Sequence, residues 1–116
     1  MEFRKQKPIY LQIADRLMEQ ILGGQPAEDE RMPSVRDVAG QMGVNPNTVM
    51  RSFDYLQGEG IIYTRRGMGY YVAVGARDKI IAEQRREFLE EELPLIKQKM
   101  KTLGIGINEL TLDDVI

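Results

Sequence analysis

Residues 31–74, RMPSVRDVAGQMGVNPNTVMRSFDYLQGEGIIYTRRGMGYYVAV, contain the pattern that decides the fold. The segment RMPSVRDVAGQMGV predicts a short helix, NPNTVMRSFDYLQGEG predicts a second helix, and IIYTRRGMGYYVAV predicts a small β-hairpin. Two short helices joined by a tight turn present the second helix to the DNA major groove, and a following hairpin can lie along the backbone or reach the minor groove. This order of elements is typical of a winged helix-turn-helix and makes DNA binding the leading hypothesis.

Capping residues define the ends of both helices. Ser34 begins a capping box that ends at Asp37, in which hydroxyl and carboxylate satisfy each other's free amides, and Gly43 ends the helix. Asn45 caps the second helix, and Pro46 occupies its first position, where no N–H is needed. The apolar positions expected to face the core are Val35, Val38, Ala39, Met42, Val49, Phe53 and Leu56.

Another amphipathic helix is expected before this stretch, over residues 9–22. Ile13, Leu17 and Ile21 recur every four residues and form one apolar stripe. Two glycines end the helix, and a polar loop with an acidic run follows over residues 25–32. The stripe is expected to pack against the two helices of the decisive stretch.

From residue 76 the sequence takes on a long helical pattern, which predicts a helix over residues 77–101. Pro94 should kink this helix, because it lacks an N–H and crowds the carbonyl of Glu90. A short last helix is expected over residues 107–116, with Thr111 and Asp114 as alternative caps of a later start. The apolar residues of this tail, spaced near a 3.5-residue repeat, are Ile81, Phe88, Leu89, Leu93, Ile96, Met100 and Leu103.

This apolar stripe is too long to be buried by the small N-terminal core alone. It either folds back on the domain as ordinary core or pairs with its copy in a second subunit. We favour a homodimer, because a two-fold axis would place two recognition helices on successive turns of DNA, ~34 Å apart, and demand a palindromic site. The predicted fold class is α+β, mostly α, with a winged helix-turn-helix domain over residues 1–75 and a short C-terminal helical dimerisation segment over residues 76–116.

The composition is that of a globular protein and argues against several other classes. Hydrophobic residues make up 42% and charged residues 29% of the 116-residue chain. No apolar run approaches the ~20 residues needed to cross a bilayer, and no export signal follows Met1, so a cytoplasmic location and no membrane partner are expected. The chain has no Cys and no His, which excludes disulfides, structural zinc and Cys–His catalysis. No cofactor, metal or catalytic residue is expected.

The net charge of −2 hides an uneven layout of charges. Residues 1–75 carry nine basic and nine acidic side chains, whereas residues 76–116 carry seven and nine. Phosphate attraction depends on the local field, so a neutral domain with one basic face can bind DNA. The basic residues that would form this face are Arg4, Lys5, Lys7, Arg36, Arg51, Arg65 and Arg66.

Candidate DNA contacts lie in three places. Asn47, Thr48 and Arg51 begin the second helix, where they can reach base edges or phosphates instead of forming only a solvated face. Arg36 can meet a phosphate at the start of the preceding helix or form a surface ion pair with Asp37. The hairpin tip combines glycines, which allow a tight turn, with arginines suited to a minor groove. The full set is Ser34, which is mainly a cap, Arg36, Asn45, Asn47, Thr48, Arg51, Arg65, Arg66, Gly67 and Gly69.

The segments PIYLQIADRLMEQILGG and MPSVRDVAGQMGVNPNTVMRSFDYLQGEGIIYTRRGMGYYV resemble the GntR family of bacterial transcription regulators over residues 8–74. The NPNTV start and the short helical tail are similar to its YtrA subfamily. The resemblance implies a homodimeric repressor that binds a palindromic operator in double-stranded DNA, often near transporter genes. It also implies DNA contacts by Arg36, Asn47, Thr48, Gly67 and Gly69.

The chain departs from the family at two positions of the recognition helix. Many members carry arginines where this chain has Pro46 and Met50. Arg51 therefore becomes the substitute candidate for reading bases, and Met50 either touches a thymine methyl or packs against a neighbouring helix. Longer relatives have a separate effector domain. Here we expect any small-molecule effector to bind at the dimer interface.

Other functions stay open at this point. A protein-interaction module would use the same helix to bind a protein, and would show no salt-dependent DNA affinity and no loss of binding on Arg51→Ala. A small-molecule sensor with DNA as its output would need a pocket between the tail helices. An enzyme ranks last, because no paired-carboxylate or phosphate-loop motif is present and residues 90–92 are interpreted as a solvated acidic face.

Overall fold

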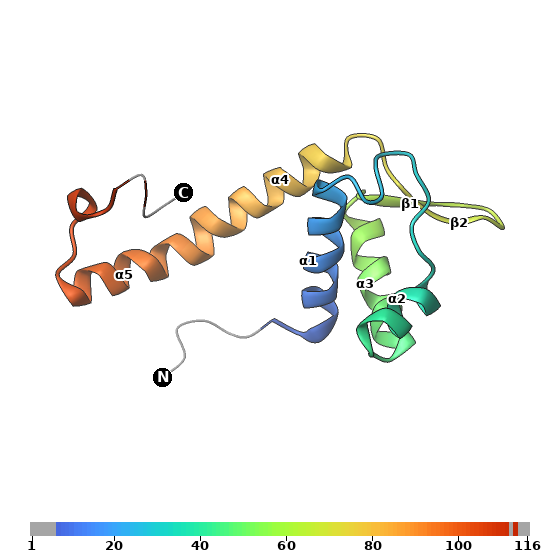
Figure 1. Cartoon of the computed structure of the whole chain (residues 1–116), viewed down its shortest axis with the longest axis horizontal. Helices are drawn as coiled ribbons and strands as arrows, with labels where there is room; N and C mark the ends of the chain where they lie inside the picture. The colour runs from blue at the N-terminus through green and yellow to red at the C-terminus, as the bar shows by residue number, and fades with distance from the viewer. Residues whose placement is uncertain (1–6, 112, 114–116) are drawn as a thin grey trace. The chain divides into compact units, whose positions relative to one another are not determined.

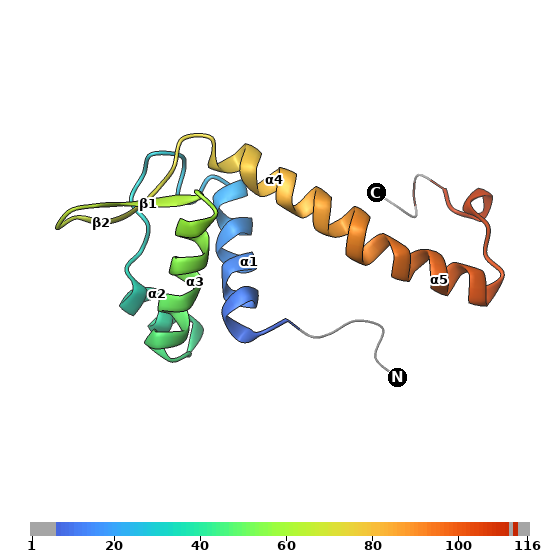
Figure 2. The same ribbon diagram turned by 180° about the vertical axis from the view of Figure 1, so that it is seen from behind.

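The computed structural model describes residues 7–111 and residue 113, and Figures 1 and 2 show it from opposite sides. Most of the chain is helical, and the one sheet among the described residues has two antiparallel strands. This arrangement confirms the predicted winged helix-turn-helix. The elements in chain order are α1 (Ile9–Leu22), α2 (Val35–Met42), α3 (Pro46–Gly58), β1 (Ile62–Arg65), β2 (Gly69–Val72), α4 (Ala76–Glu87), a π-helical segment (Phe88–Glu92), α5 (Leu93–Leu103) and a 3-10 turn (Ile107–Glu109).

The described chain divides into two compact units, one up to Ala82 and the other from Glu83 onward. The core of the first unit lies between α1, α2 and α3, which lie side by side in Figures 1 and 2. Ala76 and Ile80 are fully buried in this core, so the first turns of α4 belong to it. The core residues are Ile13, Ala14, Leu17, Met18, Ile21, Met32, Val38, Ala39, Val49, Phe53, Leu56, Ile61, Ile62, Val72, Ala76 and Ile80.

The helix ends follow the capping residues that the sequence predicts. The first helix spans the expected residues. Ser34 Oγ accepts a hydrogen bond from the Asp37 amide at 3.0 Å, but the other half of the predicted capping box, from the Ser34 amide to the Asp37 carboxylate, does not form among the described residues. Gly43 ends α2 in the left-handed conformation, with φ of 66°. Asn45 Oδ1 accepts from the Asn47 amide at 2.7 Å, and a proline occupies the first turn of α3. Local capping chemistry therefore positions both helices of the pair.

The turn of the hairpin contains fewer residues than the sequence indicates. Arg65 pairs with Gly69 at the end of the ladder, so only residues 66–68 form the turn. The loop before α2 adds a third, strand-like edge to this hairpin. The Val72 amide donates to the Glu30 carbonyl at 2.9 Å, and the Asp29 amide donates to the Val72 carbonyl at 2.7 Å. The loop predicted only as polar is therefore part of the wing.

Glu28 in this loop caps α4 from a distance in sequence. Its carboxylate accepts hydrogen bonds from the Gly75 amide at 3.0 Å and the Arg77 amide at 3.2 Å. A carboxylate on the free amides of a helix N-terminus also meets the positive end of the helix dipole. These two backbone hydrogen bonds, helped by the charge of Arg77, lower the pKa of Glu28. The loop thus fixes the residue at which α4 begins.

The tail helix continues past Pro94, but its hydrogen bonding changes just before the proline. The segment Phe88–Glu92 is π-helical, and α5 then runs to Leu103, two residues further than predicted. The prediction of a helix over residues 107–116 was wrong for its first part. The 3-10 turn Ile107–Glu109 is followed by extended backbone at Leu110. So short a run, followed by the β-branched Thr111, does not sustain an α-helix. Residues 112 and 114–116 lie outside the described residues.

No helix in the described part of the chain is long and apolar enough to cross a membrane.

Glu28→Gln should reduce stability near neutral pH and remove part of the protein's sensitivity to acid. The pKa of Glu28 lies below its ordinary value of 4.5 in the folded protein. Its contribution is therefore complete above pH 4.5 and is lost as the pH falls through the lowered pKa. Thermal unfolding of both proteins between pH 7 and pH 3 should show a difference in Tm that shrinks below pH 4.5. An equal difference at every pH would contradict this role.

Candidate nucleic-acid interface

The packing of α3 turns its predicted DNA-reading side chains outward. Val49 and Phe53 are completely buried on one side of the helix. On the other side Asn47 and Arg51 are exposed and Thr48 is half-buried. In Figures 1 and 2, α1 lies on one side of α3, and α2 and the hairpin lie on the other. The start of α3 is therefore free to approach a groove of DNA.

Arg51 is held in place by an aromatic ring from α1, a contact that the sequence analysis missed. Its guanidinium carbon lies 4.2 Å from the centre of the Tyr10 ring. The Tyr10 backbone is fixed in turn, because its carbonyl accepts a 2.7 Å hydrogen bond from the buried Ser52 hydroxyl. A cation–π contact of this kind contributes about 0.5–1 kcal/mol at an exposed site. The contact with Tyr10 therefore favours one position of the Arg51 side chain on the surface of α3.

Met50 packs toward the wing rather than toward a neighbouring helix. Its sulfur lies 3.7 Å from the hydroxyl of Tyr70 on β2. The Tyr70 ring meets Phe53 edge to face, with centroids 4.9 Å apart. Met50 still exposes 41% of its surface. The recognition helix and the hairpin are thus joined by one aromatic cluster.

Arg65 is tied to the face of the hairpin. Its guanidinium lies 4.1 Å from the centre of the Tyr71 ring and donates to the Tyr63 hydroxyl at 2.9 Å and to Asp29 at 3.3 Å. Tyr63 also donates its hydroxyl to Asp29, and this hydrogen bond raises the pKa of Tyr63. Asp29 adopts a positive φ of 67° to reach these partners. Arg65 is therefore engaged within the protein.

Two other predicted arginines have no such partners among the residues that the structure describes. Arg66 lies in the exposed turn of the hairpin and Arg36 on the exposed first turn of α2. The ion pair of Arg36 with Asp37 does not form in the described chain. Both guanidinium groups are free to meet phosphates.

Arg31 is a basic residue of the wing that the sequence analysis left out. It forms a bridge with Tyr71 at the edge of the hairpin. Its guanidinium lies 3.4 Å from the point that a Cβ would occupy at Gly69, and Gly69 has a φ of 95°. A side chain at Gly69 would be strained by this backbone conformation and would lie in contact with the arginine. No local sequence pattern signals this neighbour.

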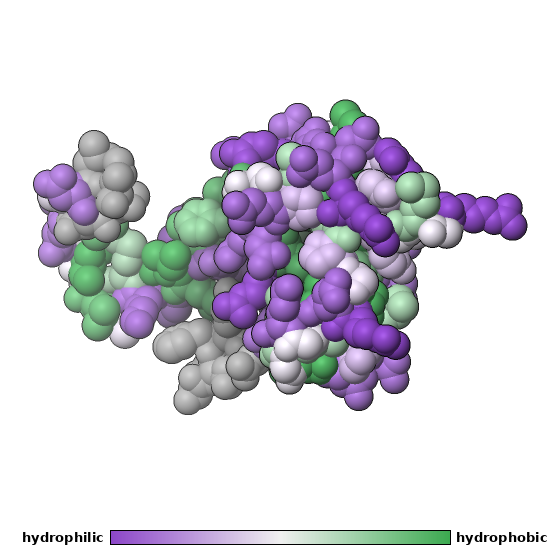
Figure 3. All heavy atoms as spheres, turned by 45° about the vertical axis from the view of Figure 1, so that its right-hand side comes forward, coloured by the Kyte–Doolittle hydropathy of each residue, from purple (hydrophilic) through white to green (hydrophobic). Residues whose placement is uncertain are grey.

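The predicted contacts of α2, α3 and the hairpin all lie in the first unit. In Figure 3 hydrophilic side chains cover most of the visible face of this unit and project furthest at one end. Short polar groups and arginines on a helix start and a hairpin are suited to reading base edges and neutralising phosphates. The fold and this surface define a winged-helix DNA-binding protein.

Comparison with known proteins identifies the family. Residues 9–72 match the family model described as bacterial regulatory proteins, gntR family. The chain is 37% identical to the transcriptional regulator YhcF of Bacillus subtilis, over 94% of this chain and 88% of YhcF. It is 35% identical to the transcriptional repressor YtrA of the same organism, over 88% of this chain and 72% of YtrA. The protein belongs to the GntR family and is a DNA-binding transcriptional regulator.

Solved structures agree with this assignment. A putative transcriptional regulator of the GntR family from Bacteroides thetaiotaomicron has a TM-score of 0.74 and 48% identity, over 88% of each chain. The DNA-binding domain of AraR in complex with operator ORE1 has a TM-score of 0.55 and 26% identity, over 59% of this chain and 83% of that one. The resemblance to the GntR family that the sequence indicates is therefore confirmed.

Arg65→Ala and Arg66→Ala should differ in how they change the salt dependence of DNA binding. Log affinity falls with log salt concentration, and each phosphate contact increases the magnitude of this slope by about 0.9. We expect Arg66→Ala to reduce this slope by about 1. Arg65→Ala should leave the slope unchanged and lower the stability of the hairpin. Titrations at several salt concentrations measure both, and an equal reduction by Arg65→Ala would contradict the distinction.

Tyr10→Leu should weaken operator binding through Arg51. Loss of the ring under the guanidinium is expected to reduce affinity about two- to fivefold, the equivalent of an exposed cation–π contact. Tyr10→Phe keeps the ring and should bind like the unmodified protein. In an Arg51→Ala background Tyr10→Leu should have no further effect. Additive effects of the two substitutions would contradict a positioning role for Tyr10.

Proposed function

We propose that this chain is a dimeric repressor that occupies a palindromic operator. The observation that carries the proposal is the outward-facing start of α3, where Arg51 is fixed over Tyr10 beside exposed Asn47. Arg36 and Arg66, on either side of this helix start in sequence, supply charge for phosphates. Base reading by α3 and phosphate binding by α2 and the hairpin together give sequence-specific binding.

The proposed dimer rests on the exposed apolar side chains of the tail. Phe88 exposes 42%, Leu89 51%, Ile96 43% and Leu103 61% of its surface. Contiguous apolar surface of this kind is stabilised when a partner covers it. A second copy is the partner that gives two recognition helices with two-fold symmetry, and so a palindromic site. The tail from residue 76 is therefore proposed as the dimerisation segment, and Ile81, Leu93 and Met100 as its other contacts.

Repression is the mode of regulation that we favour. A dimer bound across a promoter excludes other proteins by occupying the DNA. The similarity to the repressor YtrA, and at 37% identity over part of the chain to the repressor NagR of Bacillus subtilis, supports this mode. The regulated genes are proposed to lie in a nearby operon, such as one that encodes a transporter.

Selection of bound fragments from the source genome tests this proposal. The purified chain is incubated with fragmented DNA at low and moderate salt, and the retained DNA is sequenced. We expect enrichment of a short palindrome, lost in Arg51→Ala but kept in Arg16→Ala, which removes the same charge from the exposed side of α1. Unselective retention that disappears at moderate salt would reduce the function to phosphate attraction. Retention of no DNA would overturn the proposal.

A reporter gene placed behind the enriched palindrome then tests repression. Expression of the chain should lower reporter output several-fold, and the Arg51→Ala variant should not. Increased output would identify an activator instead.

A further inference from the structure

The π-helical turn in the tail, Phe88–Glu92, changes how side chains are arranged around the helix. The Leu93 amide donates to the carbonyl of Phe88, five residues earlier, where an α-helix would join residues four apart. Such a turn accommodates one extra residue inside an otherwise α-helical segment. The helix beyond it is rotated by ~100° relative to an uninterrupted α-helix with the same sequence.

The π turn decides which apolar side chain before it shares a face with those after it. In an uninterrupted α-helix Leu89, four residues before Leu93, would lie on that face. Phe88 and Leu93 are five residues apart, which would separate them by ~140° around an α-helix. The π turn places Leu93 above Phe88 instead. Beyond Leu93 the row continues at intervals of three, four and three, whereas Leu95 lies on another side of the helix. The tail face, as we name this row, consists of Phe88, Leu93, Ile96, Met100 and Leu103.

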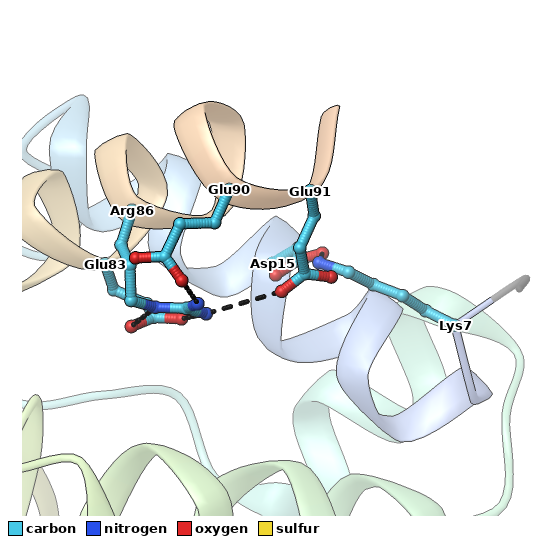
Figure 4. A network of polar contacts seen from close by, with 6 residues as sticks. All are labelled: Lys7, Asp15, Glu83, Arg86, Glu90 and Glu91. Atoms are coloured by element: carbon cyan, nitrogen blue, oxygen red, sulfur yellow. Dashed lines mark hydrogen bonds and ion pairs between the residues drawn. The ribbon is translucent and has the colours of Figure 1, made fainter. Parts of the chain in front are cut away.

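Two features of the sequence favour a π turn at this place. Pro94 has no N–H to give to the Glu90 carbonyl and would crowd it in an α-helix, so widening the preceding turn relieves the clash. Arg86 pairs with Glu83 at 2.6 Å, with Glu90 at 3.3 Å and with Glu91 at 3.6 Å (Figure 4). Glu91 is five residues beyond Arg86, a spacing that a π turn brings within reach.

The charges beside the tail face have opposite signs at its two ends. Residues 83–92 contain five glutamates and two arginines, a net charge of −3, whereas residues 93–103 contain three lysines and no acid, a net charge of +3. A second copy aligned antiparallel would place each acidic half beside a basic half. A parallel copy would place like charges together. Charge complementarity therefore favours an antiparallel copy of the same tail.

We propose that the π turn sets the register of the tail face and that this face pairs, antiparallel, with the tail face of a second copy of the chain. The inference rests on the dimer of the proposed function and specifies its geometry.

Two single-residue deletions test the register. Both deletions are made together with Pro94→Ala, which removes the clash that favours a π turn. Deletion of Glu91 then removes the extra residue, so Phe88 and Leu93 become four apart in an uninterrupted α-helix and the tail face is kept. Deletion of Gln98 has the same size but rotates Met100 and Leu103 away from the face by ~100°. Sedimentation equilibrium should give a dimer Kd within about threefold of the unmodified value for the first deletion, and weakened about tenfold or more for the second. Circular dichroism checks that both variants keep their helix content.

The outcomes separate this inference from the proposed function. The unmodified chain can be dimeric while both deletions weaken the dimer equally, or while only deletion of Glu91 weakens it. Either result would overturn the register but would leave the proposed dimer supported. A monomeric unmodified chain at micromolar concentration would overturn both.

Cysteine cross-linking tests the direction of pairing, because the chain has no Cys of its own. Under oxidising conditions Phe88→Cys mixed with Leu103→Cys should give a disulfide between the two variants. Neither variant should form one with itself. Efficient self-linking of Leu103→Cys would show parallel pairing and overturn the antiparallel arrangement.

Discussion

The packing of α3 on α1 is the constraint on which the rest of the winged-helix unit depends. Val49, Phe53 and Leu56 are completely buried along one side of α3. The buried Ser52 hydroxyl donates to the carbonyls of Tyr10 and Thr48, at 2.7 Å and 3.2 Å, so its burial costs no unsatisfied polar group. A helix that buries this side must present the opposite side to solvent. The same contact brings the Tyr10 ring under Arg51, and core packing thereby shapes the surface proposed to read DNA.

The acidic loop before α2 is the second organising feature. Its three carboxylates have separate tasks, although they are adjacent in sequence. Glu28 caps α4, Asp29 holds Tyr63 and Arg65 on the hairpin, and Glu30 accepts the Ala27 amide within the loop itself. An acidic run near a DNA-binding surface would be unfavourable if it faced phosphates. Here much of its hydrogen-bonding capacity is used to fix the wing and the start of the tail.

Much of the fold could be predicted from the sequence, because its signals are local. The apolar period of α1, the cap at Ser34 and the Asn45–Pro46 pair each act within one helical turn. The tasks of Glu28 and Asp29 could not be predicted, because their partners lie more than thirty residues away. The stacking of Arg51 on Tyr10 is hidden for the same reason. Sequence reasoning therefore predicted the helices and the hairpin that carry the proposed interface, and the structure shows how these elements are held.

The tail shows a different limit of prediction from sequence. A strict 3.5-residue pattern and a proline together predict a kinked helix, and Pro94 indicated the right place for the irregularity. The π turn itself could not be predicted from the apolar spacing, because Leu89 lies four residues before Leu93 and continues the row as in an ordinary α-helix.

The number of chains bound to one operator duplex tests the central claim most directly. Native mass spectrometry of the complex with the enriched palindrome, and with a duplex carrying a single half-site, provides this number. Two chains on the palindrome, with much weaker binding to the single half-site, is the predicted result. One chain on the palindrome, or equal affinity for both duplexes, would contradict a dimer that reads two half-sites.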